Sequence, residues 1–180
     1  MNIMAGDLSN IVLIGMPGSG KSTVGVILAK LTSRSFVDTD VLIQTKQGRS
    51  LQNIVDRHGY LALRAIEEKV LLDLDCRSHV IATGGSAVYS RAAMGHLKSY
   101  GIVVFLNVSL DTLKSRVHDF ETRGLAKRPD QSVTDLFAER SALYQQYADV
   151  TIDCVGLRHE EVCAKIIEDL KRMERKGRSQ

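Results

Sequence analysis

The chain has 180 residues, a formal net charge of +3, 44% hydrophobic residues and 25% charged residues. This length suits one domain, residues 1–180 with a core at about 10–170, and is too short for two enzymes. The basic excess lies mainly in the tail "KRMERKGRSQ", residues 171–180, which lacks aromatic residues. We therefore expect a frayed helix end there and no nucleic-acid binding.

The N-terminus and the cysteines indicate where the protein works. The start "MNIMAGDLSN" has neither a basic region nor a long apolar run, which argues against a signal peptide or a membrane anchor. Cys76, Cys154 and Cys163 lack C-x-x-C spacing, and the five histidines are scattered. This pattern favours reduced thiols over disulfides or a zinc site, so we expect a cytoplasmic protein.

Strand-like apolar runs alternate with helical patterns along the chain. The strands are predicted at 11–14, 35–37, 80–82, 102–106 and 150–152, and the helices at about 21–32, 59–76, 109–119, 133–147 and 158–174. Residues 44–50 and 121–132 are expected to be irregular, and Ser50 and Ser132 to begin the helices that follow. The alternation predicts a five-stranded parallel sheet with helices on both faces, a three-layer α/β/α fold.

The first strand runs into the glycine-rich loop "GMPGSGKST", residues 15–23. Its glycines let successive N–H groups point inward, and a helix starting near Lys21 adds its positive dipole, so the loop predicts a phosphate site. Lys21 would reach the outer phosphates of ATP, and the Ser22 hydroxyl would coordinate Mg²⁺. We assign the nucleotide to a P-loop made of Gly15, Pro17, Gly18, Ser19, Gly20, Lys21, Ser22 and Thr23.

The stretch "FVDTD" supplies the acidic residues of the predicted site. The chain has no guanine-reading Asn-Lys-x-Asp stretch, and none of the candidate strands ends in Asp-Glu, which argues against a regulatory GTPase and against a motor-type ATPase. Asp38 and Asp40 instead follow the second strand, at the sheet edge where such folds bind ligands. One can serve the metal and the other an acceptor hydroxyl; alternatively, one of them caps the helix from Val41.

Two helical arginines are candidates for binding an anionic acceptor, because a guanidinium fork matches a carboxylate. Arg64 lies three residues before Glu67, and Arg140 lies on the helix after the second irregular stretch. The alternative is that each is a solvated arginine with a partner on its own helix.

That irregular stretch has the composition of a lid. Residues 120–131 contain Gly124, Pro129 and five charged side chains but few large apolar ones. We expect a loop that is open or mobile without ligands and closes over ATP and acceptor together.

These motifs together resemble the shikimate kinases. The resemblance rests on "GMPGSGKSTVG", "FVDTD", "LRAIEEKVL", "VIATGGSAV", "VVFLNV" and "ERSALYQQYAD", in this order over residues 10–154. It implies a nucleoside-monophosphate-kinase-like fold and transfer of phosphate from magnesium-ATP to a ring hydroxyl of shikimate. We expect a monomer whose partners are these two small molecules.

The resemblance also implies roles for single residues. Asp38 would be linked to Mg²⁺, and Asp40 would hold the acceptor hydroxyl and take its proton. The other implied roles are an adenine contact by Arg116, a grip on the shikimate carboxylate by Arg64 and Arg140, backbone contacts to shikimate by Gly84 and Gly85, and a catalytic lid arginine, Arg123, with Arg128 as second choice.

The chain departs from the family pattern around the acceptor. Ser86 stands where a third glycine is usual, and Val55 and Leu63 stand where phenylalanines are usual. Two alternatives therefore stay open: a related kinase for another small carboxylated polyol, and a nucleotide-dependent regulatory protein without transfer.

Overall fold

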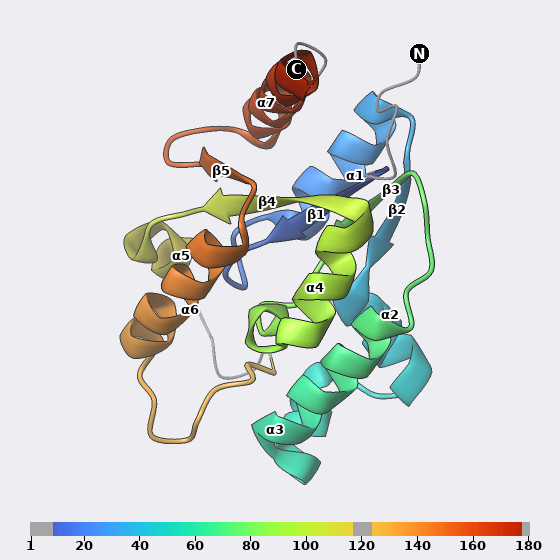
Figure 1. The fold of residues 1–180 in the computed structure, drawn as a ribbon. Helices are drawn as coiled ribbons and strands as arrows, with labels where there is room; N and C mark the ends of the chain where they lie inside the picture. Colours follow the sequence, from blue (N-terminus) through green and yellow to red (C-terminus); the bar gives the residue numbers. More distant parts are fainter. Residues whose placement is uncertain (1–8, 117–123, 178–180) are drawn as a thin grey trace.

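Five parallel strands form the central sheet of the computed structural model, which describes residues 9–116 and 124–177 (Figure 1). Their order is β2-β3-β1-β4-β5. They are β1 (Asn10–Ile14), β2 (Ser35–Asp38), β3 (His79–Ala82), β4 (Gly101–Asn107) and β5 (Val150–Asp153). The predicted parallel sheet is confirmed, and every predicted strand lies inside an observed one. The continuous apolar runs of β1 and β4 are buried, as expected for central strands of a parallel sheet.

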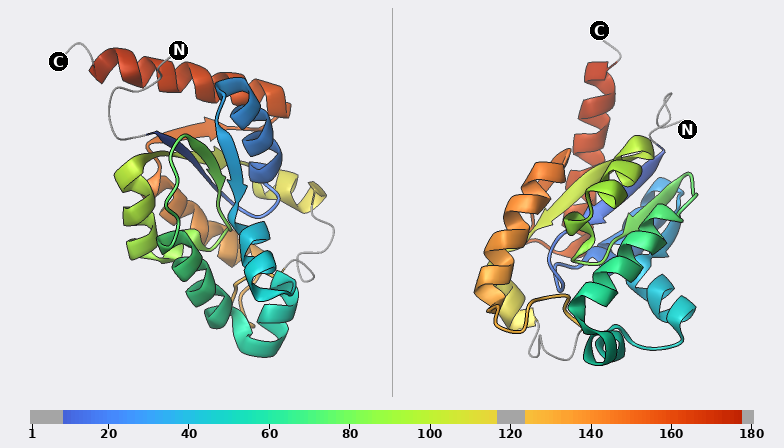
Figure 2. Two further views of the ribbon diagram at one scale, coloured as in Figure 1. Left: turned by 90° about the vertical axis from the view of Figure 1, so that its right-hand side faces the viewer. Right: turned by 60° about the horizontal axis from the view of Figure 1, so that its bottom comes forward.

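Helices cover both faces of this sheet, which confirms the three-layer architecture. They are α1 (Lys21–Thr32), α2 (Thr39–Gln47), α3 (Leu51–Leu72), α4 (Arg91–Tyr100), α5 (Leu110–Arg116), α6 (Val133–Tyr147) and α7 (His159–Gly177). Helices α1 and α7 pack together on one face, and α4 and α6 lie on the other (Figure 2). Helices α2 and α3 pack against each other beyond one end of the sheet (Figure 1). In the described ranges, no helix is both long and apolar enough to cross a membrane.

Three helical predictions were wrong. Residues 44–47 belong to α2 and are not irregular, α3 begins at Leu51 rather than 59, and α4 was not predicted. Helix α2 is short and ends at the left-handed Gly48, while α4 carries alanines and Gly95, which weaken an apolar pattern. Gly59 interrupts α3 with a non-helical backbone, φ 81° and ψ 166°, so the predicted start at 59 coincides with a kink inside the helix.

Two predicted helix caps are confirmed. The hydroxyl of Ser50 accepts a hydrogen bond from the N–H of Asn53, and the hydroxyl of Ser132 accepts one from the N–H of Asp135. Each serine satisfies an N–H group that the first turn of a helix leaves without a partner. Helix α6 consequently begins at its predicted residue, which fixes the position of Arg140.

Candidate active site

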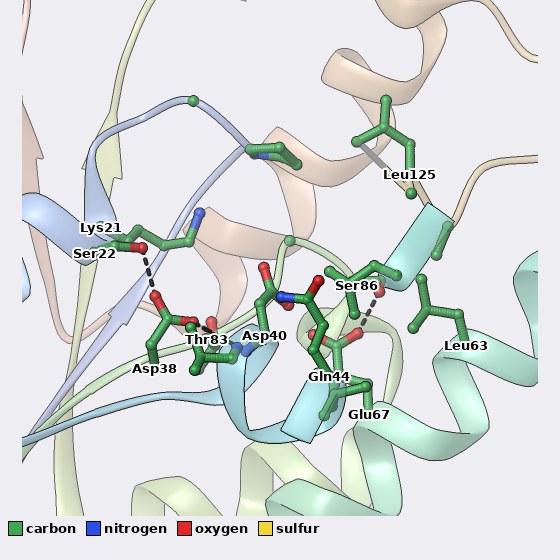
Figure 3. Close-up of a pocket in the computed structure, with 18 of the residues that line it drawn as sticks. Lys21, Ser22, Asp38, Asp40, Gln44, Leu63, Glu67, Thr83, Ser86 and Leu125 are labelled. Carbon is green, nitrogen blue, oxygen red and sulfur yellow. Dashed lines mark hydrogen bonds between the residues drawn. The ribbon is translucent and has the colours of Figure 1, made fainter. Parts of the chain in front are cut away.

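A cavity of about 790 Å³ lies at the carboxyl ends of β1 and β2. Its wall comes from the P-loop, from α2 and α3, from the loop after β3 and from α6 (Figure 3). It includes these predicted site residues: Pro17, Gly18, Gly20, Lys21, Ser22, Thr23, Asp38, Asp40, Gly85, Arg116 and Arg140. Parallel strands bring their carboxyl ends to one edge, so segments far apart in sequence meet there.

The P-loop is a tight turn that buries its lysine. Gly15, Gly18 and Gly20 have φ values of 145°, 84° and 96°, which side-chain-bearing residues rarely adopt. The Lys21 ammonium donates to the carbonyls of Gly15 and Met16, at 2.8 and 2.9 Å. Burial lowers the pKa of Lys21 to about 8, although Asp40 and Asp38 oppose the shift. Lys21 thus presents a poorly hydrated positive charge where phosphates would bind.

Asp38 joins the P-loop to α2. One carboxylate oxygen accepts the Ser22 hydroxyl at 2.5 Å, and the other accepts the N–H groups of Asp40 and Val41. Asp38 is therefore the N-cap of α2, which begins at Thr39, and it also contacts the predicted metal ligand Ser22. A hydroxyl and one carboxylate suit Mg²⁺, which usually keeps several waters and binds substrate phosphates as well. The described ranges hold no group of three or more His, Cys, Asp and Glu that could hold a metal ion.

Asp40 points into the cavity beside Lys21 (Figure 3). Burial raises the pKa of its carboxyl group, and the nearby Lys21 ammonium partly offsets this shift. Gly84 lies against this carboxylate, since a Cβ there would stand 2.6 Å from Asp40 Oδ1. A Cβ on Gly85 would stand 2.9 Å from a terminal nitrogen of Arg140. These two positions need glycine because carboxylates approach Gly84 closely and the Pro17 ring and Arg140 approach Gly85 closely.

Arg64 and Arg140 converge from different helices. Each donates a hydrogen bond to the carbonyl oxygen of Ala126, at 2.9 and 3.0 Å, and the Nε of each is buried without a partner. Arg140 is 1% exposed, so the alternative of a solvated surface arginine is wrong for it. Within the described ranges neither guanidinium forms a salt bridge. Two converging cations with free donors are the arrangement that a carboxylate would complete.

Two residues that shape this cavity, Glu67 and Tyr144, have no role predicted from the sequence. Glu67 appeared only as a neighbour of Arg64, yet it is 3% exposed and its pKa is raised to about 7 by burial and by Asp40. The hydroxyl of Tyr144 donates to the carbonyl of Gly85 at 2.6 Å and so anchors the glycine turn. The available signal was spacing: Glu67 lies on the same helical face as Arg64, and Tyr144 lies four residues after Arg140.

The remaining predicted site residues lie at different places around the main cavity. Arg64 lines a smaller adjoining hollow, Gly15 and Ser19 lie inside the P-loop, and Gly84 lies beneath Asp40 and Glu67. Leu63 lines the main cavity, whereas Val55 packs in the small apolar cluster between α2 and α3.

The lid prediction falls partly outside the described residues. Arg123 lies in the segment 117–123, which the structure does not describe. From Gly124 onward the chain runs along the cavity, with Leu125 and Ala126 buried and the Gly124 N–H donating to Gln52 Oε1 at 2.6 Å. The described part of the predicted lid, which was expected to be open, is thus packed against the start of α3. Arg128 is exposed and pairs with Glu139 at 3.4 Å.

Known proteins identify the group to which this chain belongs. The family model described as shikimate kinase matches residues 17–171. The chain belongs to the shikimate kinase family. It is 36% identical over 166 residues to shikimate kinase 2 of Enterobacter sp. (strain 638), covering 89% of this chain and 95% of that one. It is 40% identical over 152 residues to a shikimate kinase of Gloeobacter violaceus, covering 82% and 85%.

A solved shikimate kinase has the same fold as this chain. The enzyme from Acinetobacter baumannii, in complex with shikimate, is similar to it with a TM-score of 0.84 and 33% identity. The match covers 92% of this chain and 94% of that one. Family membership confirms the resemblance that the motifs indicated. It also confirms the prediction that the protein is an ATP-dependent kinase.

Proposed function

We propose that this protein transfers the γ-phosphoryl group of ATP to a ring hydroxyl of shikimate. The observation that carries the proposal is the convergence of half-buried Arg64 and buried Arg140, which share the Ala126 carbonyl and keep unpartnered Nε groups beside the cavity. Shikimate kinase relatives and the shikimate-bound neighbour support the same acceptor. A bidentate grip on the acceptor carboxylate would fix the ring and bring one hydroxyl toward Asp40.

The chemistry follows from the charges around the cavity. The P-loop N–H groups and Lys21 would bind the phosphates of ATP, and Ser22 and Asp38 would hold Mg²⁺, which supplies further charge neutralisation there. Asp40 would orient the acceptor hydroxyl and accept its proton as the oxygen bonds to the γ-phosphorus and ADP leaves. Positioning and electrostatic stabilisation, rather than a covalent intermediate, account for catalysis on this arrangement.

A coupled assay of ADP release, with and without shikimate, tests the proposed reaction. Shikimate should stimulate release strongly above the ATP-only rate. Activity with another carboxylated polyol but none with shikimate would favour the related-kinase alternative, and ATP binding without turnover would favour a regulatory protein. Three free cysteines support the further proposal that the protein is cytoplasmic, and we also propose that it is a monomer.

Replacing Arg140 by lysine should weaken acceptor binding. The substitution keeps the positive charge and removes the planar fork, so one charge-assisted bond worth about 1.5–3 kcal/mol is lost and the shikimate KM rises. The carboxamide of shikimate, which lacks the negative charge, should bind both forms about equally. Equal shikimate KM values for the two enzymes would remove Arg140 from the carboxylate site.

The lid arginine is proposed to be Arg123, which lies seven residues after Arg116 and seventeen before Arg140. Arg128 already pairs with Glu139 on its exposed side, which supports this choice. Arg123→Ala should lower kcat by about a hundredfold with little change in ATP affinity, as expected for an interaction made in the transition state. A large loss of kcat in Arg128→Ala alone would assign the role to Arg128 instead. Unchanged kcat in both variants would mean that the lid supplies no catalytic arginine.

A further inference from the structure

Gly124 packs directly against the first turn of α3. It has a left-handed φ of 63°, and a Cβ there would stand 2.5 Å from the backbone nitrogen of Gln52 and 2.5 Å from the carbonyl carbon of Leu51. Backbone therefore meets backbone, and a residue with a side chain would force one segment to shift. The Gly124 N–H donates to Gln52 Oε1 at 2.6 Å, which joins positions 72 residues apart in the sequence.

Asp56 orients the Gln52 carboxamide for this contact. Gln52 Nε2 donates to Asp56 Oδ1 at 2.7 Å, one turn further along α3. An ionised carboxylate only accepts hydrogen bonds, so the amide nitrogen faces Asp56 and the amide oxygen is left for Gly124. We call these three residues, Asp56, Gln52 and Gly124, the amide relay. Its helical part lies wholly before the non-helical Gly59, on the first segment of α3.

The two residues after Gly124 form part of the wall of the main cavity. Leu125 is 7% and Ala126 3% exposed, and both line this cavity. Leu125 packs in the core cluster, whereas Ala126 packs with Leu63 in the small apolar cluster between α2 and α3. Leu125 and Leu63 lie on the same side of the cavity, away from Lys21 (Figure 3). The segment 124–126 thus walls the part of the cavity that is remote from the P-loop lysine.

This segment also borders the position proposed for the acceptor carboxylate. The carbonyl oxygen of Ala126 accepts a hydrogen bond from the buried Arg140 guanidinium at 3.0 Å. Gly124 is two residues before Ala126, so a shift of Gly124 carries Leu125 and Ala126 with it. Such a shift would disturb the acceptor part of the cavity and leave the phosphate loop in place.

We propose that Gln52 is a positioning residue of the acceptor site. Its carboxamide, oriented by Asp56, holds Gly124 at the start of α3 and so keeps Leu125 and Ala126 in place as the wall against which the acceptor ring packs. The inference deepens the proposed function and rests on it for the identity of the acceptor. It assigns acceptor affinity in part to an amide relay that acts through the backbone of Gly124.

Gln52→Ala tests this role by comparing the two substrates. The KM for shikimate should rise about tenfold, because the wall must then be ordered when the acceptor binds. The ATP KM should change by less than about twofold, and kcat at saturating substrate should stay close to wild type. Gln145→Ala, at an exposed glutamine of α6, is the matched control and should change neither KM. Equal increases in both KM values, or a lower kcat with unchanged KM values, would overturn the proposal.

A paired substitution separates the relay from general damage at position 52. Gln52→Glu alone places two carboxylates one helical turn apart, so it should break the bond to position 56 and raise the shikimate KM. Adding Asp56→Asn supplies an amide donor to the new carboxylate, whose other oxygen can still accept the Gly124 N–H. The double variant should return to within about threefold of the wild-type KM. A double variant no better than Gln52→Glu alone would contradict the relay.

Hydrogen exchange of the Gly124 amide, measured without substrate, keeps the inference separate from the proposed function. Exchange should be about tenfold or more faster in Gln52→Ala and near normal in the double variant. Unchanged exchange in Gln52→Ala would show that Gln52 does not hold Gly124, and faster exchange with an unchanged shikimate KM would remove the relay from the acceptor site. If wild type phosphorylates another carboxylated polyol instead of shikimate, the proposed function fails, and the same KM comparison with that acceptor decides the role of Gln52.

Discussion

Lys21→Ala is expected to abolish phosphoryl transfer while leaving the protein folded. The Lys21 ammonium lies in the turn of the P-loop, where it donates to the carbonyls of Gly15 and Met16. Charge that develops on the transferring phosphoryl group would lose this stabilisation, so we expect kcat to fall by about a thousandfold or more. Burial already disfavours the charged form of Lys21, so its removal should cost little stability.

The control for this prediction is Lys21→Met, which keeps most of the side-chain length and lacks the charge. Both variants should show Tm values close to that of wild type and no shikimate-stimulated ADP release. Near-normal turnover in either variant would show that the P-loop assignment is wrong. Loss of the cooperative unfolding transition would instead mean that Lys21 is needed for folding. The loss of activity would then not show a catalytic role for its charge.

Asp40→Asn is expected to lower kcat by about a hundredfold or more with ATP affinity little changed. Asparagine keeps the shape of the side chain and removes the charge that would orient the acceptor hydroxyl and accept its proton. The fold should tolerate the change, because Asp38 and not Asp40 caps α2. Single-turnover measurements with saturating shikimate, together with ATP titrations, would separate the chemical step from binding.

Asp38→Asn is the matched control for Asp40→Asn, since the two aspartates are two residues apart and face different groups. It should raise the concentration of Mg²⁺ needed for half-maximal activity, because Asp38 contacts Ser22 at the proposed metal position. If Asp40→Asn changed only the ATP KM, Asp40 would belong to the nucleotide site and the acceptor role would pass to another residue.

Local sequence signals predicted the strands and the phosphate loop well. Each of these features is encoded within about ten neighbouring residues: an apolar run for a strand, a glycine pattern for the P-loop, and a serine for each of two helix caps. Helix α4 was missed, and α2 was anticipated only as a helix from Val41 capped by an aspartate. Helix α2 is short and α4 has few large apolar residues, so packing rather than local pattern defines them.

The sequence could not reveal the partners of the acceptor-site residues. Arg64 and Glu67 share a helical face, and local spacing therefore suggested that they pair. In the folded chain Glu67 accepts from Ser86, nineteen residues away, and Arg64 donates to Ala126, sixty-two residues away. Buried charges take the partner that the surrounding fold brings within reach, and the sequence alone does not specify those distances.

The sequence by itself determined the phosphate-binding loop, the parallel α/β fold and membership of the shikimate kinase family, because these depend on residue types at fixed local spacing. Only the tertiary structure decided that Arg140 is buried, that Glu67 faces the cavity and that Gln52 meets Gly124. Helices α2, α3 and α6 and the loop after β3 meet at one edge of the sheet. Contacts between such distant segments form only when the sheet orders them, and burial then fixes each charge against its nearest available partner.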